Sequence, residues 1–144
     1  MTQKKRNFLN YNGVTLFKPN FKEFTEGLKV DIKKDNFKSI HEIAKVFQTE
    51  KQIEYLLLTL SEQGVLISAS DNYYHIPAHI RDIADVSGAG DTVISVASLC
   101  LAAKLNPSLL AAISNLAGGL VCEKIGVVAI EKERLLEETL LLEL

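Results

Sequence analysis

Residues 85–92 read Asp-Val-Ser-Gly-Ala-Gly-Asp-Thr, and a run of almost wholly apolar residues follows, from 92 to 103. The two glycines let the backbone turn tightly and leave neighbouring amide groups uncovered. The apolar run predicts a core helix over 92–105. Because the free amides at the start of a helix attract anions, the segment predicts a phosphate-binding turn with Asp91 beside it.

Asp91 is the candidate catalytic residue of this segment. A carboxylate beside an anion-binding turn can accept the proton of a hydroxyl group. The amides of Gly88, Ala89 and Gly90 would stabilise the charge that develops on the transferred group. A plainer interpretation is that Asp91 caps the helix and that the glycines form an ordinary turn. Short glycine motifs recur by chance, so the local sequence leaves both interpretations open.

Composition and charge exclude several classes of function. The chain has 144 residues, of which 47% are hydrophobic and 24% are charged, and its formal net charge is −2. This balance is typical of a soluble globular protein, and no basic face for nucleic acid is evident. The apolar run at 92–103 is shorter than the ~20 residues that span a membrane, and no signal segment is seen at the N-terminus. We expect a cytoplasmic protein that binds neither nucleic acid nor membranes.

The cysteines and histidines do not predict a metal site. Cys100 and Cys122 lie in apolar helical stretches without a CxxC pattern, so buried free thiols in a reducing compartment are expected. His75 and His79 lie in a strand-like stretch, and no third ligand is near them. We interpret these two residues, and the lone His41, as surface or partly packed side chains.

The order of the expected helices and strands predicts an α/β fold in which helices pack on a twisted sheet. Asn20 is expected to cap the first helix, and a Ser39–Glu42 capping box is expected to start the second. Gly126 is expected to follow the last turn of the helix that begins at Pro107. The expected strands are 14–17, 53–59, 65–68, 73–77 and 127–130, and the expected helices are 21–28, 39–47, 92–105, 107–125 and 131–144.

Two of these helices carry more apolar surface than a short chain comfortably covers. The helix over 92–103 is apolar on nearly all sides, and the last helix is rich in leucine. An apolar helix face needs another surface to bury it. We therefore expect the chain to self-associate or to pair with a missing segment.

The 85–92 segment resembles the second signature of the PfkB/ribokinase family of carbohydrate kinases, which is a D-x-x-G-A-G-D turn and helix. The resemblance implies a ribokinase-like, three-layer α/β fold with helices packed on a mostly parallel sheet. It also implies that Asp91 is the catalytic base and that the amides of residues 88–90 form the anion hole. ATP and Mg²⁺ are the implied cosubstrate and cofactor.

Two further segments follow the order of the family's motifs. Asn20 and Glu23 match its N-x-x-E motif, which implies that they organise Mg²⁺ and the phosphates, usually through water. Without the resemblance they are only a helix cap and a first-turn acid. Residues 59–64 resemble the family's T-x-G-x-x-G nucleotide loop, with Thr59 and Gly64 retained and Ser61 in place of the first glycine.

Two smaller sites follow from the same resemblance. Asn115 falls where the family lines its adenine pocket, although a polar residue on a helix face is the simpler interpretation. Asp85, Ser87 and Gly126 match positions that hold a monovalent cation in some members.

The resemblance covers residues 1–144 as the C-terminal, nucleotide-binding half of the family's kinase domain, and it is greatest to heptose-7-phosphate kinases. The implied function is transfer of the ATP γ-phosphoryl group to a carbohydrate hydroxyl. The alternative is a non-catalytic nucleotide-binding fragment, because most of the sugar site belongs to the N-terminal half of the family. A Rossmann-like dinucleotide binder is less consistent with the sequence, because its glycine motif would follow the first strand.

Overall fold

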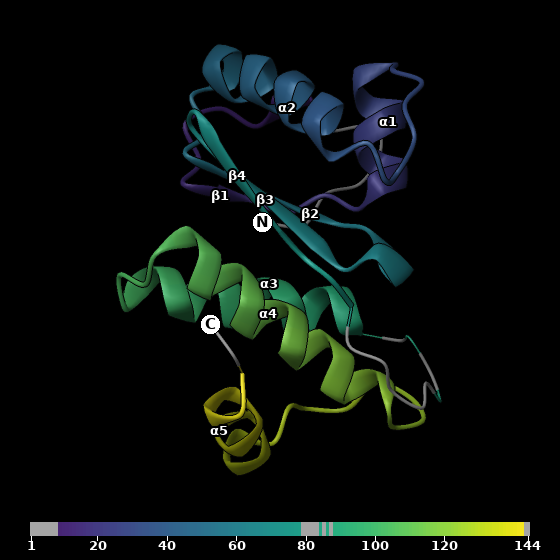
Figure 1. The fold of residues 1–144 in the computed structure, drawn as a ribbon, viewed down its shortest axis with the longest axis vertical. Coiled ribbons are helices and arrows are strands. Elements are labelled where there is room, and N and C mark those ends of the chain that lie inside the picture. Colours follow the sequence, from purple (N-terminus) through teal and green to yellow (C-terminus); the bar gives the residue numbers. More distant parts are fainter. Residues whose placement is uncertain (1–8, 79–83, 85, 87, 143–144) are drawn as a thin grey trace. The chain divides into compact units, whose positions relative to one another are not determined.

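The computed structural model describes residues 9–78, 84, 86 and 88–142, and the chain divides into two compact units, Met1–Pro77 and Ala78–Leu144. The first unit contains a mixed sheet with two helices, and the second contains three helices (Figure 1). The strands are β1 (Leu16–Phe17), β2 (Tyr55–Thr59), β3 (Val65–Ala69) and β4 (Asn72–Ile76). The helices are α1 (Phe21–Leu28), α2 (Phe37–Lys51), α3 (Ala89–Ala102), α4 (Pro107–Cys122) and α5 (Lys132–Leu140).

The sheet of the first unit has the strand order β1-β2-β3-β4. β1 pairs with β2 in parallel, whereas the pairs β2–β3 and β3–β4 are antiparallel. The α/β fold is confirmed, but the prediction of a mostly parallel sheet is wrong for the strands of this chain. The reason is the length of the connections: short turns join β2 to β3 and β3 to β4, and a short turn can join only antiparallel strands. Only β1 and β2, which are separated by α1 and α2, have the crossover that a parallel pair needs.

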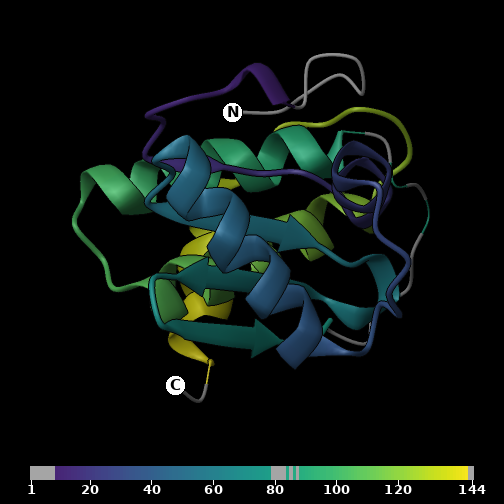
Figure 2. The same ribbon diagram turned by 90° about the horizontal axis from the view of Figure 1, so that it is seen from above.

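Helices α1 and α2 lie on one face of the sheet, and α2 runs across the strands (Figures 1 and 2). Between these helices and the sheet lies a cluster of buried apolar side chains. Its members are Phe17, Phe24, Ile40, Ala44, Phe47, Ile53, Leu56, Leu58, Leu60 and Leu66. Each large apolar side chain buried in this way contributes roughly 1.5–3 kcal/mol. The cluster therefore holds the ends of β1 and β2 in fixed register with the two helices.

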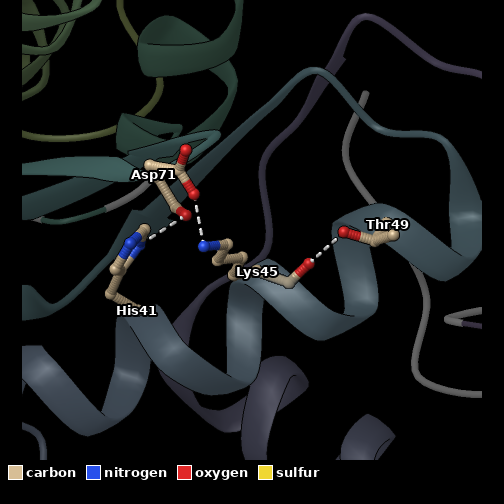
Figure 3. Close-up of polar contacts among 5 residues, drawn as sticks. His41, Lys45, Thr49 and Asp71 are labelled. Carbon is tan, nitrogen blue, oxygen red and sulfur yellow. Dashed lines mark hydrogen bonds and ion pairs between the residues drawn. The ribbon is translucent and has the colours of Figure 1, made fainter.

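Polar contacts also attach α2 to the strands beneath it. The side-chain nitrogen Nε2 of Gln48 donates to the backbone carbonyl of Ser68 at 3.0 Å. Nδ1 of His41 shares a hydrogen bond of 2.9 Å with the Ser68 hydroxyl. At the β3–β4 turn, the Lys45 ammonium forms an ion pair with the Asp71 carboxylate (Figure 3). The side-chain oxygen of Gln48, Oε1, is buried and has no hydrogen-bond partner among the described residues. These contacts join residues that are 20 to 27 positions apart, so they define the tertiary placement of α2.

The starts of α1 and α2 test the predicted caps. α1 begins as predicted: Asn20 is its N-cap, and Asn20 and Glu23 form a reciprocal capping box. α2 begins at Phe37, and its N-cap is Asn36, whose side chain accepts from the Ser39 amide at 3.4 Å. The predicted Ser39–Glu42 capping box is therefore wrong. Asn36 is itself a good N-cap residue, and the cap that it provides puts Ser39 inside the first turn.

The second unit differs from the prediction at several helix ends. α3 begins at Ala89, three residues earlier than expected, because Gly88 adopts a left-handed conformation (φ 74°) and acts as its N-cap. α4 is capped by Asn106 and begins at Pro107 as predicted, but it ends at Cys122. Gly126 is therefore not the residue that follows the helix. It lies in the loop after α4, where it has a φ of 82°.

The expected strand at 127–130 is also wrong, since these residues form an irregular segment before α5. Ion pairs between Lys124 and Glu131 and between Glu123 and Arg134 join the two ends of this loop. α5 is shorter than the predicted final helix. The loop is therefore closed by side chains and not by backbone pairing.

The apolar excess expected from the sequence is visible on the second unit. Leu99 of α3 is 71% exposed, and Leu136, Leu140 and Leu141 are 57%, 76% and 77% exposed. Cys100 is buried as predicted, whereas Cys122 is only half-buried. Within the described part of the chain, no helix combines the length and the hydropathy that a membrane span requires.

Candidate functional site

The first turn of α3 carries the predicted catalytic residue. Gly88 is the N-cap, so Asp91 is the third residue of the helix, and its side chain is exposed. The interpretation of Asp91 as the N-cap is therefore wrong. A carboxylate in the first turn lies near the positive end of the helix dipole. Such a group can reach a ligand from solvent while remaining part of a rigid helix.

The backbone around Gly88 has the features expected of an anion-binding turn. Ala89 donates its amide to the Val86 carbonyl at 3.3 Å, which is long for a hydrogen bond, and Thr92 makes the first helical bond to the Gly88 carbonyl at 3.0 Å. Gly90 is the second residue of α3, where the helix itself supplies no acceptor for the amide. Of the three predicted anion-hole amides, that of Ala89 is thus partly engaged within the turn.

Two close contacts determine how this turn is packed within the second unit. A Cβ atom built on Gly88 would lie 3.1 Å from Cγ1 of Val127, so the loop after α4 lies directly against the turn. A Cβ atom built on Gly118 would lie 2.7 Å from Cγ2 of Val93 and 3.9 Å from the Ala89 carbonyl oxygen. Gly118 therefore lets α4 approach the start of α3 closely. Neither contact was predicted from the sequence, because a glycine does not indicate which side chain of another segment will pack against it.

The remaining residues predicted for the second unit lie near this turn or outside the described chain. Asn115 is on α4, one turn before Gly118, and residues spaced in this way share a helix face. Gly126 precedes Val127 in the loop that packs on Gly88. Asp85 and Ser87, the other predicted cation ligands, lie outside the described residues, as does His79.

In the first unit, the predicted nucleotide loop and the N-x-x-E motif lie side by side. Asn20 forms a parallel bridge with Thr59, and the Thr59 amide donates to the Pro19 carbonyl at 3.1 Å. Both segments follow the carboxyl ends of the parallel strands β1 and β2, the edge at which α/β sheets generally bind ligands. The structure therefore brings Asn20, Glu23 and the loop at 59–64 together.

The predicted nucleotide loop has a backbone conformation that usually requires glycine. Ser61 has a φ of 50° and Gly64 a φ of 85°, both in the left-handed region. The loop is closed by a bond of 2.8 Å from the Leu60 amide to the Gly64 carbonyl and by one of 3.0 Å from the Gly64 amide to the Ser61 carbonyl. Ser61 thus has a positive φ, which glycine adopts more readily, at the position where the family's motif has glycine.

Of the charged groups near this loop, Glu62 is exposed, whereas Lys34 and Glu23 are half-buried. The carboxylate of Glu62 accepts from its own backbone and pairs with the Lys34 ammonium at 3.3 Å, and these contacts lower the pKa of Glu62. Asn20 and Glu23 each use one side-chain oxygen in the capping box, at 2.8 and 2.9 Å. The other carboxylate oxygen of Glu23 takes no part in the capping box and can accept a hydrogen bond from water.

The side-chain oxygens of Asn20 and Glu23 fit the Mg²⁺ role that the resemblance implies. Among the described residues, no group of three His, Cys, Asp or Glu side chains is placed to hold a metal ion. Mg²⁺ in nucleotide sites usually takes one or two carboxylates and completes its shell with waters and phosphates. Asn20 and Glu23 suit this kind of site, because Asn20 is exposed and Glu23 half-buried beside the strand edge, and the cap uses one side-chain oxygen of each.

Comparisons with known proteins agree with these motifs. Residues 2–134 match the family described as pfkB family carbohydrate kinase. The bifunctional protein HldE of Shewanella piezotolerans is 38% identical over 136 residues, which make up 93% of this chain and 28% of that relative. The chain thus spans about a quarter of the length of this curated relative.

Solved structures with the same fold are more distant in sequence. Phosphofructokinase-2 from Escherichia coli, solved in complex with potassium, has a TM-score of 0.82 at 18% identity; the match covers 95% of this chain and 43% of that one. Ribokinase from Thermotoga maritima has a TM-score of 0.73 at 18% identity, covering 95% of this chain and 44% of that one. The predicted ribokinase-like fold is confirmed. Together with the family match over most of its length, these findings lead to one conclusion: the chain belongs to the pfkB family of carbohydrate kinases.

Proposed function

We propose that the chain is the C-terminal, nucleotide-binding half of an ATP-dependent carbohydrate kinase. Its reaction would transfer the γ-phosphoryl group of ATP to a sugar hydroxyl. The observation that carries most weight is the first turn of α3, where an exposed Asp91 stands on a helix start whose N-cap is a left-handed glycine. Family membership supports the same chemistry.

In this proposal, Asp91 is the catalytic base. It accepts the proton of the acceptor hydroxyl as the oxygen attacks phosphorus, and the bond from phosphorus to the β-phosphate oxygen breaks. The amides of Gly88, Ala89 and Gly90 donate to the transferring phosphoryl group, where negative charge is spread over three oxygens. The helix dipole of α3 adds to this stabilisation without any reorganisation during the reaction.

The first unit would bind the nucleotide phosphates and Mg²⁺. Mg²⁺, when bound, would neutralise part of the negative charge of the nucleotide phosphates. Asn20 and Glu23 would hold its water shell, and the loop with Thr59, Ser61 and Gly64 would lie along the nucleotide. Asn115 of α4 is the proposed contact to the base.

Other parts of the proposal rest on resemblance. The acceptor favoured by the sequence and by the HldE relative is a heptose 7-phosphate. A monovalent cation held by Asp85, Ser87 and Gly126 is supported by the phosphofructokinase-2 relative, whose structure contains potassium. A cytoplasmic location also remains a proposal, together with the expectation that neither nucleic acid nor membrane is a partner.

We propose that the chain acts together with the N-terminal half of the kinase fold. The chain covers 43% of phosphofructokinase-2 and 44% of the ribokinase, so more than half of each lies outside the match. Exposed leucines of α3 and α5 suit such a partner, or a second copy of this chain. Because orientation of the acceptor contributes several kcal/mol to catalysis, the isolated chain is expected to bind MgATP without efficient turnover. This keeps open the second candidate function, that of a non-catalytic nucleotide-binding fragment.

A titration of the purified chain with MgATP, paired with a coupled assay on heptose 7-phosphate, tests these proposals. We expect saturable heat of binding, unchanged in Asp91→Asn, and little ADP release from the chain alone. Absence of MgATP binding would contradict the nucleotide-binding proposal. Efficient turnover by the chain alone would contradict the need for a partner half.

A further inference from the structure

His75 of β4 contacts the nucleotide loop, although it lies outside every motif. Its Nε2 atom forms a hydrogen bond with the carbonyl oxygen of Gln63, the last residue of the short 3₁₀ turn Ser61–Gln63. In the ladder, His75 pairs with Leu66, two residues beyond Gly64. The contact therefore arises because β3 leaves the loop directly and β4 runs back beside it.

The imidazole ring is held in place from a third element. Its centroid lies 3.8 Å from that of Phe37 with an interplanar angle of 21°, so the rings are stacked. Phe37 is the first residue of α2, and both rings are half-buried. The stack limits rotation of the imidazole, so Nε2 stays directed at the loop.

The polarity of this contact is determined by its partner. A carbonyl oxygen can only accept, so Nε2 of His75 must carry the proton. The hydrogen bond restrains the main chain between Ser61 and Gly64, both of which have left-handed φ values of 50° and 85°. A non-glycine residue in that region is strained, and it persists only where the surroundings hold it.

A second side-chain contact to the loop, the ion pair of Glu62, is weaker. Glu62 pairs with Lys34, but their side chains are 70% and 31% exposed, so the pair is screened by solvent and salt. His75 contacts backbone in a half-buried position, where hydrogen bonds lose less to water. Of these two side-chain contacts to residues 62 and 63, that of the histidine is the one expected to control the loop's conformation.

We propose that His75 is a positioning residue for nucleotide binding: by donating Nε2–H to the Gln63 carbonyl while stacked on Phe37, it keeps the loop at 59–64 in its phosphate-facing conformation. The proposal rests on the nucleotide-binding function proposed above. It assigns His75 no contact with the nucleotide and no proton transfer.

Three variants of the whole chain separate this role from general stability. His75→Phe keeps a ring to stack on Phe37 but removes the donor, and His75→Gln restores an N–H group. His41→Phe is the matched control, because His41 is the buried histidine of the same unit and bonds Ser68 instead of the loop. MgATP affinity is measured by titration, and amide hydrogen exchange is measured by NMR at Gln63 and Gly64.

We expect His75→Phe to weaken MgATP binding by roughly 3- to 10-fold, the value of one hydrogen bond. Exchange at Gln63 and Gly64 should accelerate relative to the β2–β3 ladder. His75→Gln should recover part of both effects, and His41→Phe should change neither selectively.

Two results would overturn the proposal. One is a wild-type imidazole whose ¹⁵N shifts report a bare Nε2, and the other is a folded His75→Phe chain with unchanged exchange in the loop. If the wild-type chain fails to bind MgATP, the nucleotide function falls, while the tautomer and exchange measurements still decide whether His75 holds the loop.

Discussion

The two units build their candidate phosphate-binding segments in different ways. In the first unit, the loop at 59–64 depends on left-handed backbone at Ser61 and Gly64 and on contacts from distant residues such as His75. In the second unit, the turn before α3 depends on a helix start, which presents its amides by local geometry, and on the close approach of α4 at Gly118.

This difference indicates where each segment is sensitive to substitution. A helix terminus supplies its amides whatever the side chains are, so chemistry in the second unit depends on one carboxylate and on packing behind the turn. A loop has no such repeating geometry, so the first unit depends on backbone conformation and on the residues that restrain it. The following predictions test that contrast, beginning with the largest expected effect.

Asp91→Asn should have the largest effect on activity. In a complete kinase that contains this chain, we expect kcat to fall by about 10²–10⁴-fold, because the amide cannot accept the hydroxyl proton. Affinity for MgATP should be unchanged. Steady-state kinetics measure both quantities, with Ser98→Ala on an exposed position of the same helix as the control. Retained turnover would mean that Asp91 is not the catalytic base. The chemistry of the second unit would then not depend on this carboxylate.

Gly118→Ala tests whether close packing positions the turn. The new Cβ would lie 2.7 Å from Cγ2 of Val93, so we expect destabilisation of roughly 1–3 kcal/mol from overpacking, reduced by the ~0.5–1 kcal/mol gain in helix propensity. Urea denaturation measures the change.

The matched variants are Gly119→Ala, which gains the same propensity at a half-buried position, and the double variant Gly118→Ala/Val93→Ala. Removal of the Val93 methyl groups should make the double variant more stable than the sum of the two single changes. Additive effects would mean that the contact does not hold α4 against the turn.

Gly64→Ala should change the stability of the first unit more than Ser61→Gly does. Gly64 combines φ 85° with ψ −130°, a conformation costly for any residue with a side chain, so alanine should destabilise by roughly 1–3 kcal/mol. Ser61→Gly relieves a left-handed serine, but the unfolded chain gains entropy, so stability should change by less than about 1 kcal/mol. Denaturation midpoints give both values. A large loss in Ser61→Gly would show that the hydroxyl, and not the backbone, matters there.

Asp71→Asn should have the smallest effect, because its ion pair with Lys45 is exposed to solvent. The hydrogen bond from Lys45, and then its charge, hold the pKa of Asp71 below its ordinary value. A lowered folded pKa means that the contribution to stability is present above the unfolded pKa and is lost as the pH falls through the folded pKa. The difference between wild type and variant should therefore disappear in acid and shrink at high salt. Denaturation midpoints at neutral and acidic pH check this, and a difference that persists in acid would contradict it.

Local sequence was sufficient for features that neighbouring residues decide. The Asn20 cap of α1 and the start of α4 at Pro107 both depend on groups within one helical turn of each other. Where two local signals competed, the prediction failed: Asn36 displaced Ser39 as the cap of α2, and the left-handed Gly88 started α3 three residues early.

Features that join distant residues required the tertiary structure. The sequence by itself determined the family, the α/β class and the order of the motifs, because these follow from residue types and short spacings. The mixed direction of the sheet, the left-handed Ser61, the packing of Gly118 on Val93 and the bond from His75 to Gln63 were decided by the fold. The physical reason is that strand pairing, close packing and positive φ at a non-glycine residue are stabilised by contacts between segments far apart in the chain, and no single segment carries that information.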